Sequence, residues 1–270
     1  MTIESSEIDK SPILEVNKLS VSRSGKSIIE DVCLTINEGE FVGLVGPNGG
    51  GKTTFLLTIL GILKARKGSI EMYGQKPMTK SILGKVGWVS QNAANIPGNI
   101  RITVRELVQL GTLNANNMFW GGGTEQYEQV NNAMDMVGLR DVENIDVAKL
   151  SGGQRQRAVI ARVLASKAEF ILLDEPLVGI DRESRNSLLK FLDQLCHESQ
   201  KTILMVSHDI TAIQQTSHRM IFLEERIRYD GHANCFPDFA NLATLRGIQS
   251  VHEDNNFEEK LYQITNSEDK

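Results

Sequence analysis

The 270-residue sequence has few cysteines and no long apolar run. Its three cysteines, Cys33, Cys196 and Cys235, are odd in number and share no short spacing, which argues for a reducing compartment and against a disulfide framework. No apolar stretch approaches the roughly 20 residues that a membrane-spanning helix needs. The polar, acidic first ten residues lack the pattern of a signal peptide. We therefore expect any role at a membrane to be carried out from one side.

Concentrated positive charge is also missing. Residues 251–270 carry six acids and two lysines, and residues 1–10 carry three acids and one lysine. Since the whole chain has a net charge of −5, the remainder of the chain has a net charge of +1. This near-neutral body has no basic face rich enough for non-specific nucleic-acid binding, so we expect no nucleic-acid partner.

Apolar periodicity divides the chain into an α/β core and a helical insertion. Residues from about 92 to 150 contain no convincing buried strand, whereas continuous apolar runs typical of a parallel sheet occur before and after them. An asparagine- and glycine-rich loop is expected at 114–123. Strands are expected at 13–21, 33–36, 41–45, 86–90, 170–173 and 203–206, and helices at 53–63, 103–113, 127–137, from 151, and at 182–196.

The strongest local signal is the glycine-rich segment that follows the apolar run at 41–45. It fits G-x-x-x-x-G-K-[ST], the phosphate-binding P-loop, whose glycines let backbone N–H groups point at phosphate oxygens. Lys52 is expected to reach the β- and γ-phosphates of ATP, and the Thr53 hydroxyl to ligate Mg²⁺. A glycine-rich turn without a ligand would require neither side chain. The expected cradle is Gly46, Pro47, Asn48, Gly49, Gly50, Gly51, Lys52, Thr53 and Thr54.

A second signal is the pair of acids that ends the apolar run at 170–173. Such a position places carboxylates at the tip of a buried strand, where ligands bind in open α/β sheets. Asp174 is expected to hold Mg²⁺ through water, and Glu175 to act as general base towards the attacking water. Alone, the pair would be an ordinary acidic turn, but the P-loop makes the catalytic interpretation the stronger one.

The third signal is the octapeptide Leu-Ser-Gly-Gly-Gln-Arg-Gln-Arg at 150–157. Ser151 is a natural N-cap, and the Ser-Gly-Gly turn at a helix N-terminus forms a second anion cradle. Capping alone would also permit a helix that binds nothing. The octapeptide resembles the signature motif of ABC ATPases, and the resemblance extends from about residue 13 to 232.

The resemblance implies a fold and a mode of assembly. The fold is α/β: a P-loop NTPase (RecA-like) core with a mostly parallel sheet, an N-terminal antiparallel β portion and an inserted α-helical subdomain. In that family two subunits meet head to tail, and each ATP lies between one P-loop and the partner's signature. Ser151, Gly152, Gly153 and Gln154 would thus act on the nucleotide of the other subunit in a homodimer.

Further positions match the family pattern one at a time. Gln91 falls where a loop glutamine reaches Mg²⁺ and senses the membrane subunit, and His208 falls at the histidine that holds the γ-phosphate. Asp181 falls where a loop contacts the partner subunit, although it would also serve as a helix N-cap. Two positions depart from the pattern: Arg23 stands where an aromatic residue often stacks on adenine, and Gly50 replaces a more usual small residue.

The resemblance also sets the expected domain boundaries. An ABC ATPase domain is expected at 12–235, with its core at 12–91 and 159–235 and the helical subdomain at about 92–158. Residues 1–11 and 236–270 would be terminal extensions, partly disordered. As no membrane domain is fused, the ATPase would lie peripherally on the cytoplasmic face of the membrane, under integral membrane permease subunits, in a system that also has an extracellular substrate-binding protein.

Weaker resemblances concern the cargo. The region at 96–108 resembles import ATPases for metal ions and iron chelates, and three features favour the zinc and manganese branch: Phe119-Trp120 with its spacing to Gly138-Leu139, residues 177–181, and residues 160–166. An iron-chelate importer or an exporter remains an alternative. A P-loop kinase would not need the signature, and a non-transport ABC protein should show a coiled coil, a second cassette or a basic surface. His232, His252 and Cys235 match no closed metal site.

Overall fold

The computed structural model describes residues 11–113 and 123–237. The chain divides into a unit of residues 1–234 and a short unit from 235 onward, and the fold below is that of the first unit. The loop expected at 114–123, the Phe119-Trp120 pair and most of the two terminal extensions lie outside the described residues. Within the described ranges, no helix is long and apolar enough to cross a membrane.

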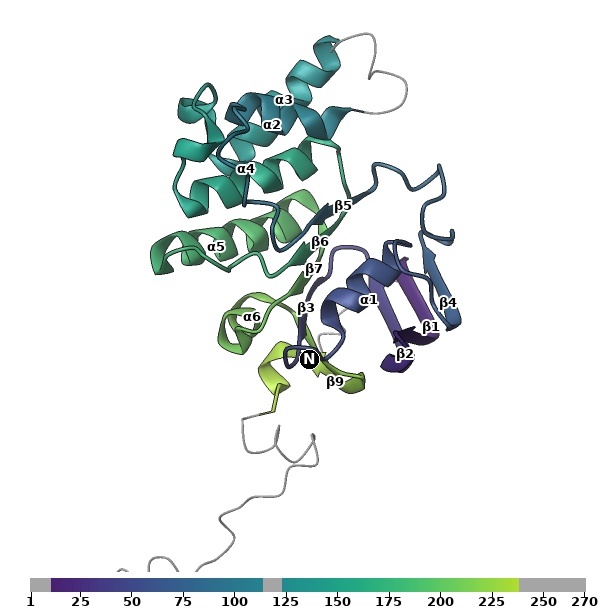
Figure 1. Cartoon of the computed structure of the whole chain (residues 1–270). Coiled ribbons are helices and arrows are strands. Elements are labelled where there is room, and N and C mark those ends of the chain that lie inside the picture. The colour runs from purple at the N-terminus through teal and green to yellow at the C-terminus, as the bar shows by residue number, and fades with distance from the viewer. Residues whose placement is uncertain (1–10, 114–122, 238–270) are drawn as a thin grey trace, which may run out of the picture. The chain divides into compact units, whose positions relative to one another are not determined.

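The larger sheet has six strands in the order β5-β6-β7-β3-β8-β9 (Figure 1). Neighbouring strands are parallel except β8 and β9, which form an antiparallel edge. β3, β6 and β7 are buried along their whole length, because helices cover both faces of a parallel sheet. The strands are β3 (Phe41–Val45), β5 (Val86–Val89), β6 (Phe170–Asp174), β7 (Thr202–Val206), β8 (Arg219–Glu224) and β9 (Arg226–His232).

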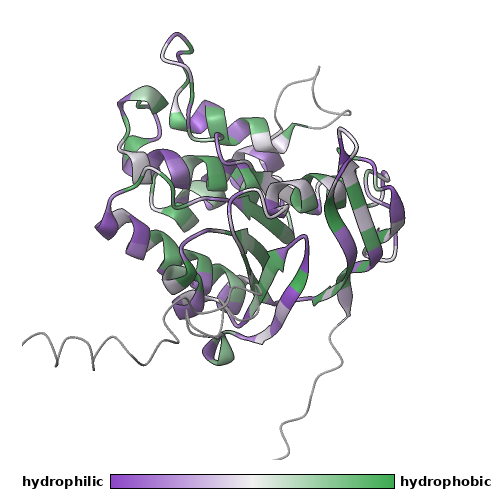
Figure 2. Cartoon of the chain, turned by 60° about the horizontal axis from the view of Figure 1, so that its bottom comes forward, coloured by the Kyte–Doolittle hydropathy of each residue, from purple (hydrophilic) through white to green (hydrophobic). Residues whose placement is uncertain are grey.

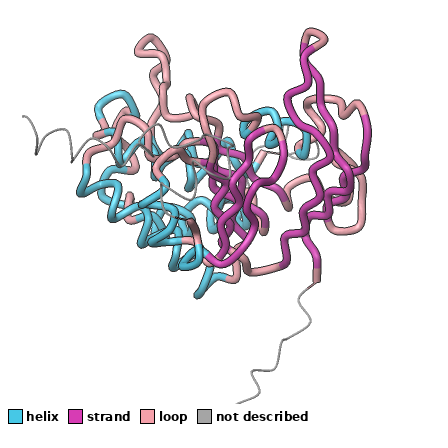
Figure 3. Tube along the Cα trace, turned by 90° about the horizontal axis from the view of Figure 1, so that it is seen from below, coloured by secondary structure: helices cyan, strands magenta, loops and turns pink. Residues whose placement is uncertain are grey.

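A separate antiparallel sheet has the order β2-β1-β4. It consists of β1 (Pro12–Arg23), β2 (Lys26–Asn37) and β4 (Lys67–Met72). β1 and β2 form a hairpin whose turn contains Ser24 and Gly25, both with positive φ. Figure 3 shows these strands as a group apart from the strands of the larger sheet.

Helix α1 (Lys52–Ile59) packs between the two sheets. Phe55, Leu56 and Ile59 are fully buried in one apolar cluster with side chains of both sheets, including Leu14 and Leu172. Figure 2 shows the hydrophobic residues concentrated along the central strands. The shared cluster fixes α1, and with it the loop that precedes α1, against the end of β3.

Of the remaining helices, α2, α3 and α4 lie together at the top of Figure 1, and α5 and α6 lie below them on the left of the larger sheet. α2, α3 and α4 contact one another, and α4 also contacts β5 where Gly87 leaves no room for a β-carbon beside Val163. α6 packs in the same manner over Gly43. The α-helices are α2 (Val104–Gln109), α3 (Thr124–Val137), α4 (Gly152–Ala165), α5 (Arg182–Ser199) and α6 (Ile210–Thr216), with 3₁₀ turns at Leu110–Thr112, Arg140–Val142, Val147–Lys149 and Ala233–Cys235.

The predicted α/β class, the antiparallel portion and the mostly parallel sheet are confirmed. Three strands were not predicted: β4, β8 and β9. β4 is mostly exposed and β9 alternates between exposed and half-buried residues at a sheet edge, so neither has a strong apolar signal. β8 contains the buried run Met220–Leu223 and was detectable from its apolar residues.

Candidate nucleotide-binding site

The P-loop runs from the end of β3 to the start of α1 and depends on its glycines. Gly49 and Gly51 have φ of 79° and 97°, which L side chains rarely adopt. A β-carbon on Gly46 would lie 2.1 Å from the Leu223 carbonyl oxygen, and one on Gly50 would lie 3.0 Å from the same atom. The end of β8 therefore supports the loop closely, which explains why glycine stands at position 50.

Lys52 is buried and folds back over the P-loop. Its Nζ donates hydrogen bonds to the carbonyl oxygens of Gly46 at 2.8 Å and Pro47 at 3.0 Å. Burial lowers the pKa of Lys52, and the nearby carboxylates of Glu175 and Asp174 act in the opposite direction. The ammonium group thus lies between the loop and the two acids that end β6.

Thr53 and Asp174 bring two oxygen ligands together at the first turn of α1. The Thr53 hydroxyl donates to Asp174 Oδ1 at 3.3 Å, and Asp174 is only 2% exposed. Burial raises the pKa of Asp174, as does the charge of Glu175, whereas the Thr53 hydrogen bond and Lys52 lower it. A buried carboxylate with a raised pKa gains most from a bound cation, because the cation replaces the lost hydration.

Glu175 and His208 form the most direct pairing in the site. Glu175 Oε2 lies 2.8 Å from His208 Nδ1 and also accepts the backbone N–H of His208 at 3.3 Å. Glu175 has a φ of 52°, an unfavourable value for a non-glycine residue, held by its N–H bond to the Val206 carbonyl. The strained turn after β6 directs the Glu175 carboxylate towards the loop that follows β7.

The loop after β7 is positioned by residues that the sequence analysis did not identify. Asp209 accepts the Ala212 N–H at 3.0 Å as the N-cap of α6, and its other oxygen pairs with Arg185 at 2.6 Å. The Ser207 hydroxyl accepts the Asp209 N–H at 3.0 Å. An aspartate directly before an apolar helix is an N-cap signal, so Asp209 was detectable from the sequence, whereas its partner Arg185 was not.

A cavity of about 320 Å³ is lined by six of the nine predicted P-loop residues. It brings Gln91 and Arg23, from distant parts of the chain, beside the P-loop and Glu175. Its size lies at the lower end of the range for small-molecule sites, roughly 300–1,000 Å³. One lining residue, Ile28 of β2, was not predicted. The lining consists of Arg23, Ile28, Asn48, Gly49, Gly51, Lys52, Thr53, Thr54, Gln91 and Glu175.

The segment Ser151–Gln154 lies elsewhere, at the N-terminus of α4. Ser151 and Gln154 form a capping box, with each side chain accepting the other's backbone N–H at 3.2 and 3.0 Å. Gly153 has no room for a β-carbon, which would approach Ser184 of α5 to 2.5 Å. Among the described residues, none of Ser151, Gly152, Gly153 and Gln154 lines the P-loop cavity. The two predicted phosphate-binding motifs therefore do not line one cavity within this chain.

Asp181 caps the N-terminus of α5. Its Oδ1 accepts the Ser184 N–H at 2.9 Å, and this hydrogen bond lowers the pKa of Asp181. The capping role considered from the sequence is thus present. Since a β-carbon on Gly152 would lie 2.9 Å from the Gly179 carbonyl oxygen, the loop before Asp181 and the start of α4 are close neighbours.

One other group of described side chains brings metal-ligating atoms together: Asp193, His197 and His218. His218 Nδ1 accepts the Phe41 N–H at 3.3 Å, so a neutral ring carries its proton on Nε2, 3.2 Å from His197 Nε2. His197 Nδ1 lies 3.2 Å from Asp193 Oδ1. A histidine that binds a metal through one ring nitrogen normally donates an N–H from the other ring nitrogen. In His218 the other nitrogen is Nδ1, which faces the Phe41 N–H, itself a donor. The ring nitrogens of both histidines are thus occupied by contacts within the protein, and we assign no metal to this group.

The P-loop cavity fits a nucleoside triphosphate with Mg²⁺. At Gly46 a β-carbon would collide with the neighbouring backbone, so the P-loop can form its backbone cradle there only with glycine. The Lys52 ammonium adds a positive charge beside this cradle. Thr53 and Asp174 offer the hard oxygen ligands that Mg²⁺ prefers. Fold and site together define the chain as a P-loop ATPase of the RecA-like type.

Comparison with known proteins identifies the family. A family model described as "ABC transporter" matches residues 29–178. The chain is 35% identical over 222 residues to the "Zinc uptake system ATP-binding protein ZurA" of Listeria innocua, covering 82% of this chain and 86% of that protein. The chain belongs to the ABC transporter family of ATPases.

Two solved structures show the same fold. One is "an inward-facing conformation of a putative metal-chelate type ABC transporter", with a TM-score of 0.77, 25% identity, and coverage of 88% of this chain and 90% of the other. The second is an ATP-binding cassette in a dimeric post-hydrolysis state bound to ADP and Pi, with a TM-score of 0.67 and 28% identity, covering 83% of this chain and all of the other.

Proposed function

We propose that this chain is the ATP-hydrolysing subunit of a metal-ion importer, taking zinc or manganese through a separate integral membrane permease. It would act as a homodimer bound peripherally to the cytoplasmic face of the membrane, together with an extracellular substrate-binding protein. The observation that carries the ATPase assignment is the cavity in which the P-loop, Gln91 and Glu175 converge. The identity with a zinc uptake ATPase supports the cargo.

In the proposed mechanism the P-loop N–H groups and Lys52 bind the β- and γ-phosphates of ATP. Mg²⁺, held by Thr53 and Asp174, would neutralise charge on the phosphate oxygens. Glu175 accepts a proton from the attacking water. The water oxygen bonds to the γ-phosphorus while the bond between the γ-phosphorus and the bridging oxygen of the β-phosphate breaks, which releases ADP and phosphate. His208, whose Nδ1 lies 2.8 Å from Glu175 Oε2, orients that carboxylate and would hold the γ-phosphate.

The separation of Ser151 from the P-loop cavity supports a dimeric site. In a head-to-tail pair the N-terminal amides of α4, with the Ser151 hydroxyl, would contact the γ-phosphate bound by the other subunit. The Ser151 oxygen already accepts the Gln154 N–H, so its own proton remains available to donate. The dimeric post-hydrolysis cassette is consistent with this arrangement.

The base contact is proposed for Arg23. Its guanidinium lines the same cavity as Thr54 and Ile28, and a planar guanidinium stacks on aromatic faces. Arg23 would thus replace the aromatic residue that the family often uses, with Ile28 as an apolar neighbour.

Mixed dimers test the composite site. A Ser151→Arg chain and a Lys52→Ala chain, each expected to be inactive alone, are combined. In a mixed dimer one site pairs a normal Lys52 with a normal Ser151, while the other site carries both substitutions. If the sites are composite, mixing restores up to half of the wild-type activity per mixed dimer. Activity that never exceeds the mean of the two parents would contradict the proposal.

The cargo is tested in the source organism. Deletion of the gene should lower cellular zinc or manganese, measured by mass spectrometry of washed cells, and the wild-type gene should restore it. A gene carrying Glu175→Gln serves as the control for an expressed but inactive subunit. Unchanged zinc and manganese with lowered iron would favour the metal-chelate alternative, and unchanged metals altogether would refute metal import.

A further inference from the structure

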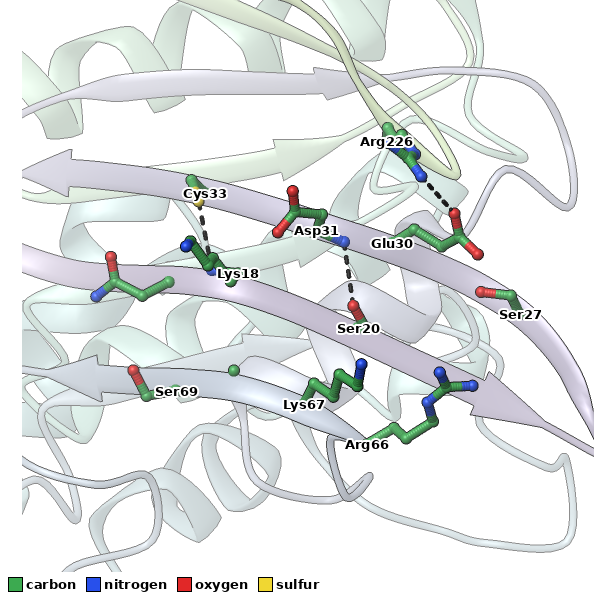
Figure 4. A pocket seen from close by; sticks show the side chains of 12 residues that line it. Lys18, Ser20, Ser27, Glu30, Asp31, Cys33, Arg66, Lys67, Ser69 and Arg226 are labelled. Carbon is green, nitrogen blue, oxygen red and sulfur yellow. Dashed lines mark hydrogen bonds and ion pairs between the residues drawn. The ribbon is translucent and has the colours of Figure 1, made fainter.

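The outer face of the small antiparallel sheet contains a second, larger cavity of about 730 Å³. It extends across β2, β1 and β4 and reaches Arg226 at the start of β9 (Figure 4). Its β1 residues include Asn17 and Ser20, which lie between the core residues Val16, Leu19 and Val21. The cavity is therefore on the side of the sheet that faces away from the apolar core.

The charges of this cavity are unbalanced. Four cations line it, Lys18, Arg66, Lys67 and Arg226, against two acids, Glu30 and Asp31, a net charge of +2. Arg226 pairs with Glu30 at 2.7 Å. Within the described residues, the side chains of Lys18, Arg66 and Lys67 form no hydrogen bond or ion pair, so three of the four cations line the cavity without a bonded partner.

Hydroxyl groups and a carboxylate complete the lining. Ser20, Ser27 and Ser69 line the cavity. The Ser27 side chain already hydrogen-bonds Glu30, whereas the Ser20 hydroxyl accepts the Asp31 N–H at 3.1 Å and keeps its own proton to donate. Cations and hydroxyl donors suit phosphate oxygens, and the Asp31 carboxylate suits a hydroxyl donor. This combination fits a phosphorylated molecule with free hydroxyl groups better than a bare inorganic anion.

The backbone around the cavity is strained. Lys18 and Asp31 have φ of 47° and 51°, left-handed conformations that non-glycine residues rarely adopt. Gly68 has a φ of 89°, and a β-carbon there would lie 2.4 Å from the Asn17 carbonyl oxygen. Register shifts in both strand pairings of β1 occur at these positions. Strain of this kind concentrates at ligand-binding sites.

A short chain of bonds connects this cavity to the P-loop. The Glu225 N–H donates to the Gly50 carbonyl at 3.3 Å, and the Glu30 N–H donates to the Glu225 carbonyl at 2.8 Å. Arg226, the next residue, pairs with the Glu30 side chain. The β8–β9 turn thus touches the phosphate cradle on one side and the second cavity on the other. A ligand that draws Arg226 from Glu30 would act on the residue that holds Gly50.

We propose that this cavity is an effector site for a small phosphorylated metabolite bearing hydroxyl groups, and that its occupancy changes the affinity of the P-loop for ATP. Lys18 and Lys67 bind the phosphate groups, and Asp31 accepts a hydroxyl. The coupling passes through Arg226 and the Glu225 backbone. The site requires neither ATP turnover nor a transported metal.

Binding is tested by calorimetry with fructose 1,6-bisphosphate, which has two phosphates, free hydroxyls and no base. The full chain carries Lys52→Ala, so that the P-loop contributes little to phosphate binding. We expect saturable binding of one ligand per chain, weakened at least tenfold by Lys18→Ala with Lys67→Ala and changed less than twofold by Lys76→Ala, an exposed lysine outside both cavities.

Coupling is tested in the chain with Lys52 intact. Saturating sugar bisphosphate should change the Kd of a fluorescent ATP analogue by at least about fivefold, the lower end of ordinary allosteric coupling. Arg226→Ala should remove this change while leaving sugar bisphosphate binding measurable. Absence of saturable binding, or binding that ignores Lys18 and Lys67, overturns the site. Binding with unchanged ATP affinity overturns the effector role. Lysine-dependent binding of phosphatidylglycerol vesicles alone would make the surface a membrane contact and overturn the proposal.

Discussion

Replacing Glu175 with glutamine separates the chemical role of this side chain from its structural role. Glutamine has nearly the same volume, and its amide oxygen accepts a hydrogen bond as Glu175 Oε2 does from His208 at 2.8 Å. The neutral amide cannot accept a proton from water. A general base contributes about 10²–10⁴-fold to a rate, so we expect kcat to fall by that factor, about 3–5.5 kcal/mol in activation free energy.

ATP binding by Glu175→Gln should be unchanged or tighter. The P-loop and Lys52 are untouched, and one negative charge beside the triphosphate is removed. Blocked turnover should therefore trap a nucleotide-bound dimer. The assays are steady-state phosphate release, equilibrium binding of a fluorescent ATP analogue, and size-exclusion chromatography with ATP and Mg²⁺.

The matched control is Glu169→Gln, which removes the same charge just before β6, where the side chain is half exposed and lies 3.9 Å from Lys85. This variant should keep kcat within about twofold, because an exposed ion pair of this type contributes at most about 1 kcal/mol to stability and none to the reaction. A Glu175→Gln enzyme with less than a threefold loss of kcat and normal ATP affinity would refute the assignment of Glu175 as general base.

Three further predictions concern Asp174, Gly46 and Arg23. Because the folded-state pKa of Asp174 is raised, its contribution to stability is lost as pH rises through that pKa. Asp174→Asn should therefore raise the melting temperature of the ligand-free protein at pH 7, and this gain should vanish below about pH 4. Turnover should be lost in the same variant. Equal melting temperatures at pH 7 would contradict this. Gly46→Ala should lower the free energy of unfolding by about 1–3 kcal/mol in urea melts, because its β-carbon meets the Leu223 carbonyl at 2.1 Å, whereas Gly98→Ala, with no atom within 4 Å, should be nearly neutral. Arg23→Ala should weaken ATP binding about 2–30-fold without changing tripolyphosphate binding, and equal losses for both ligands would exclude a base contact.

The fold was predictable where the sequence alternates buried strands and helices. β3, β6 and β7 are wholly buried and mostly apolar, and each was predicted within a residue of its observed bounds. The helix expected at 53–63 ends at Ile59, because Gly61 adopts a φ of 76° that ends the helical path. β4 and β9 carry mostly exposed polar residues, so their strand character comes from pairing with neighbours rather than from their own pattern.

The candidate site was predictable to the extent that its chemistry is written in contiguous motifs. Lys52, Thr53 and Glu175 each lie in a short segment whose residue types and flanking strand specify their surroundings. Arg23 and Gln91 were placed by resemblance alone, and the fold brings both to the same cavity. Ile28 and Arg185 belong to no motif, because their contribution depends on tertiary contacts that no local spacing encodes.

The dependence of the P-loop on β8 shows what a motif leaves out. The cradle requires Gly46 and Gly50 because the Leu223 carbonyl oxygen occupies the space that a β-carbon at either position would need. In the following turn, the Glu225 N–H donates a hydrogen bond to the Gly50 carbonyl. Leu223 and Glu225 lie far along the chain, beyond both acids and the signature. The glycines of the motif are thus only half of a contact whose other half is backbone. A substitution in the β8–β9 turn would therefore change the conformation of the P-loop, and with it phosphate binding, without altering any residue that the motifs identify.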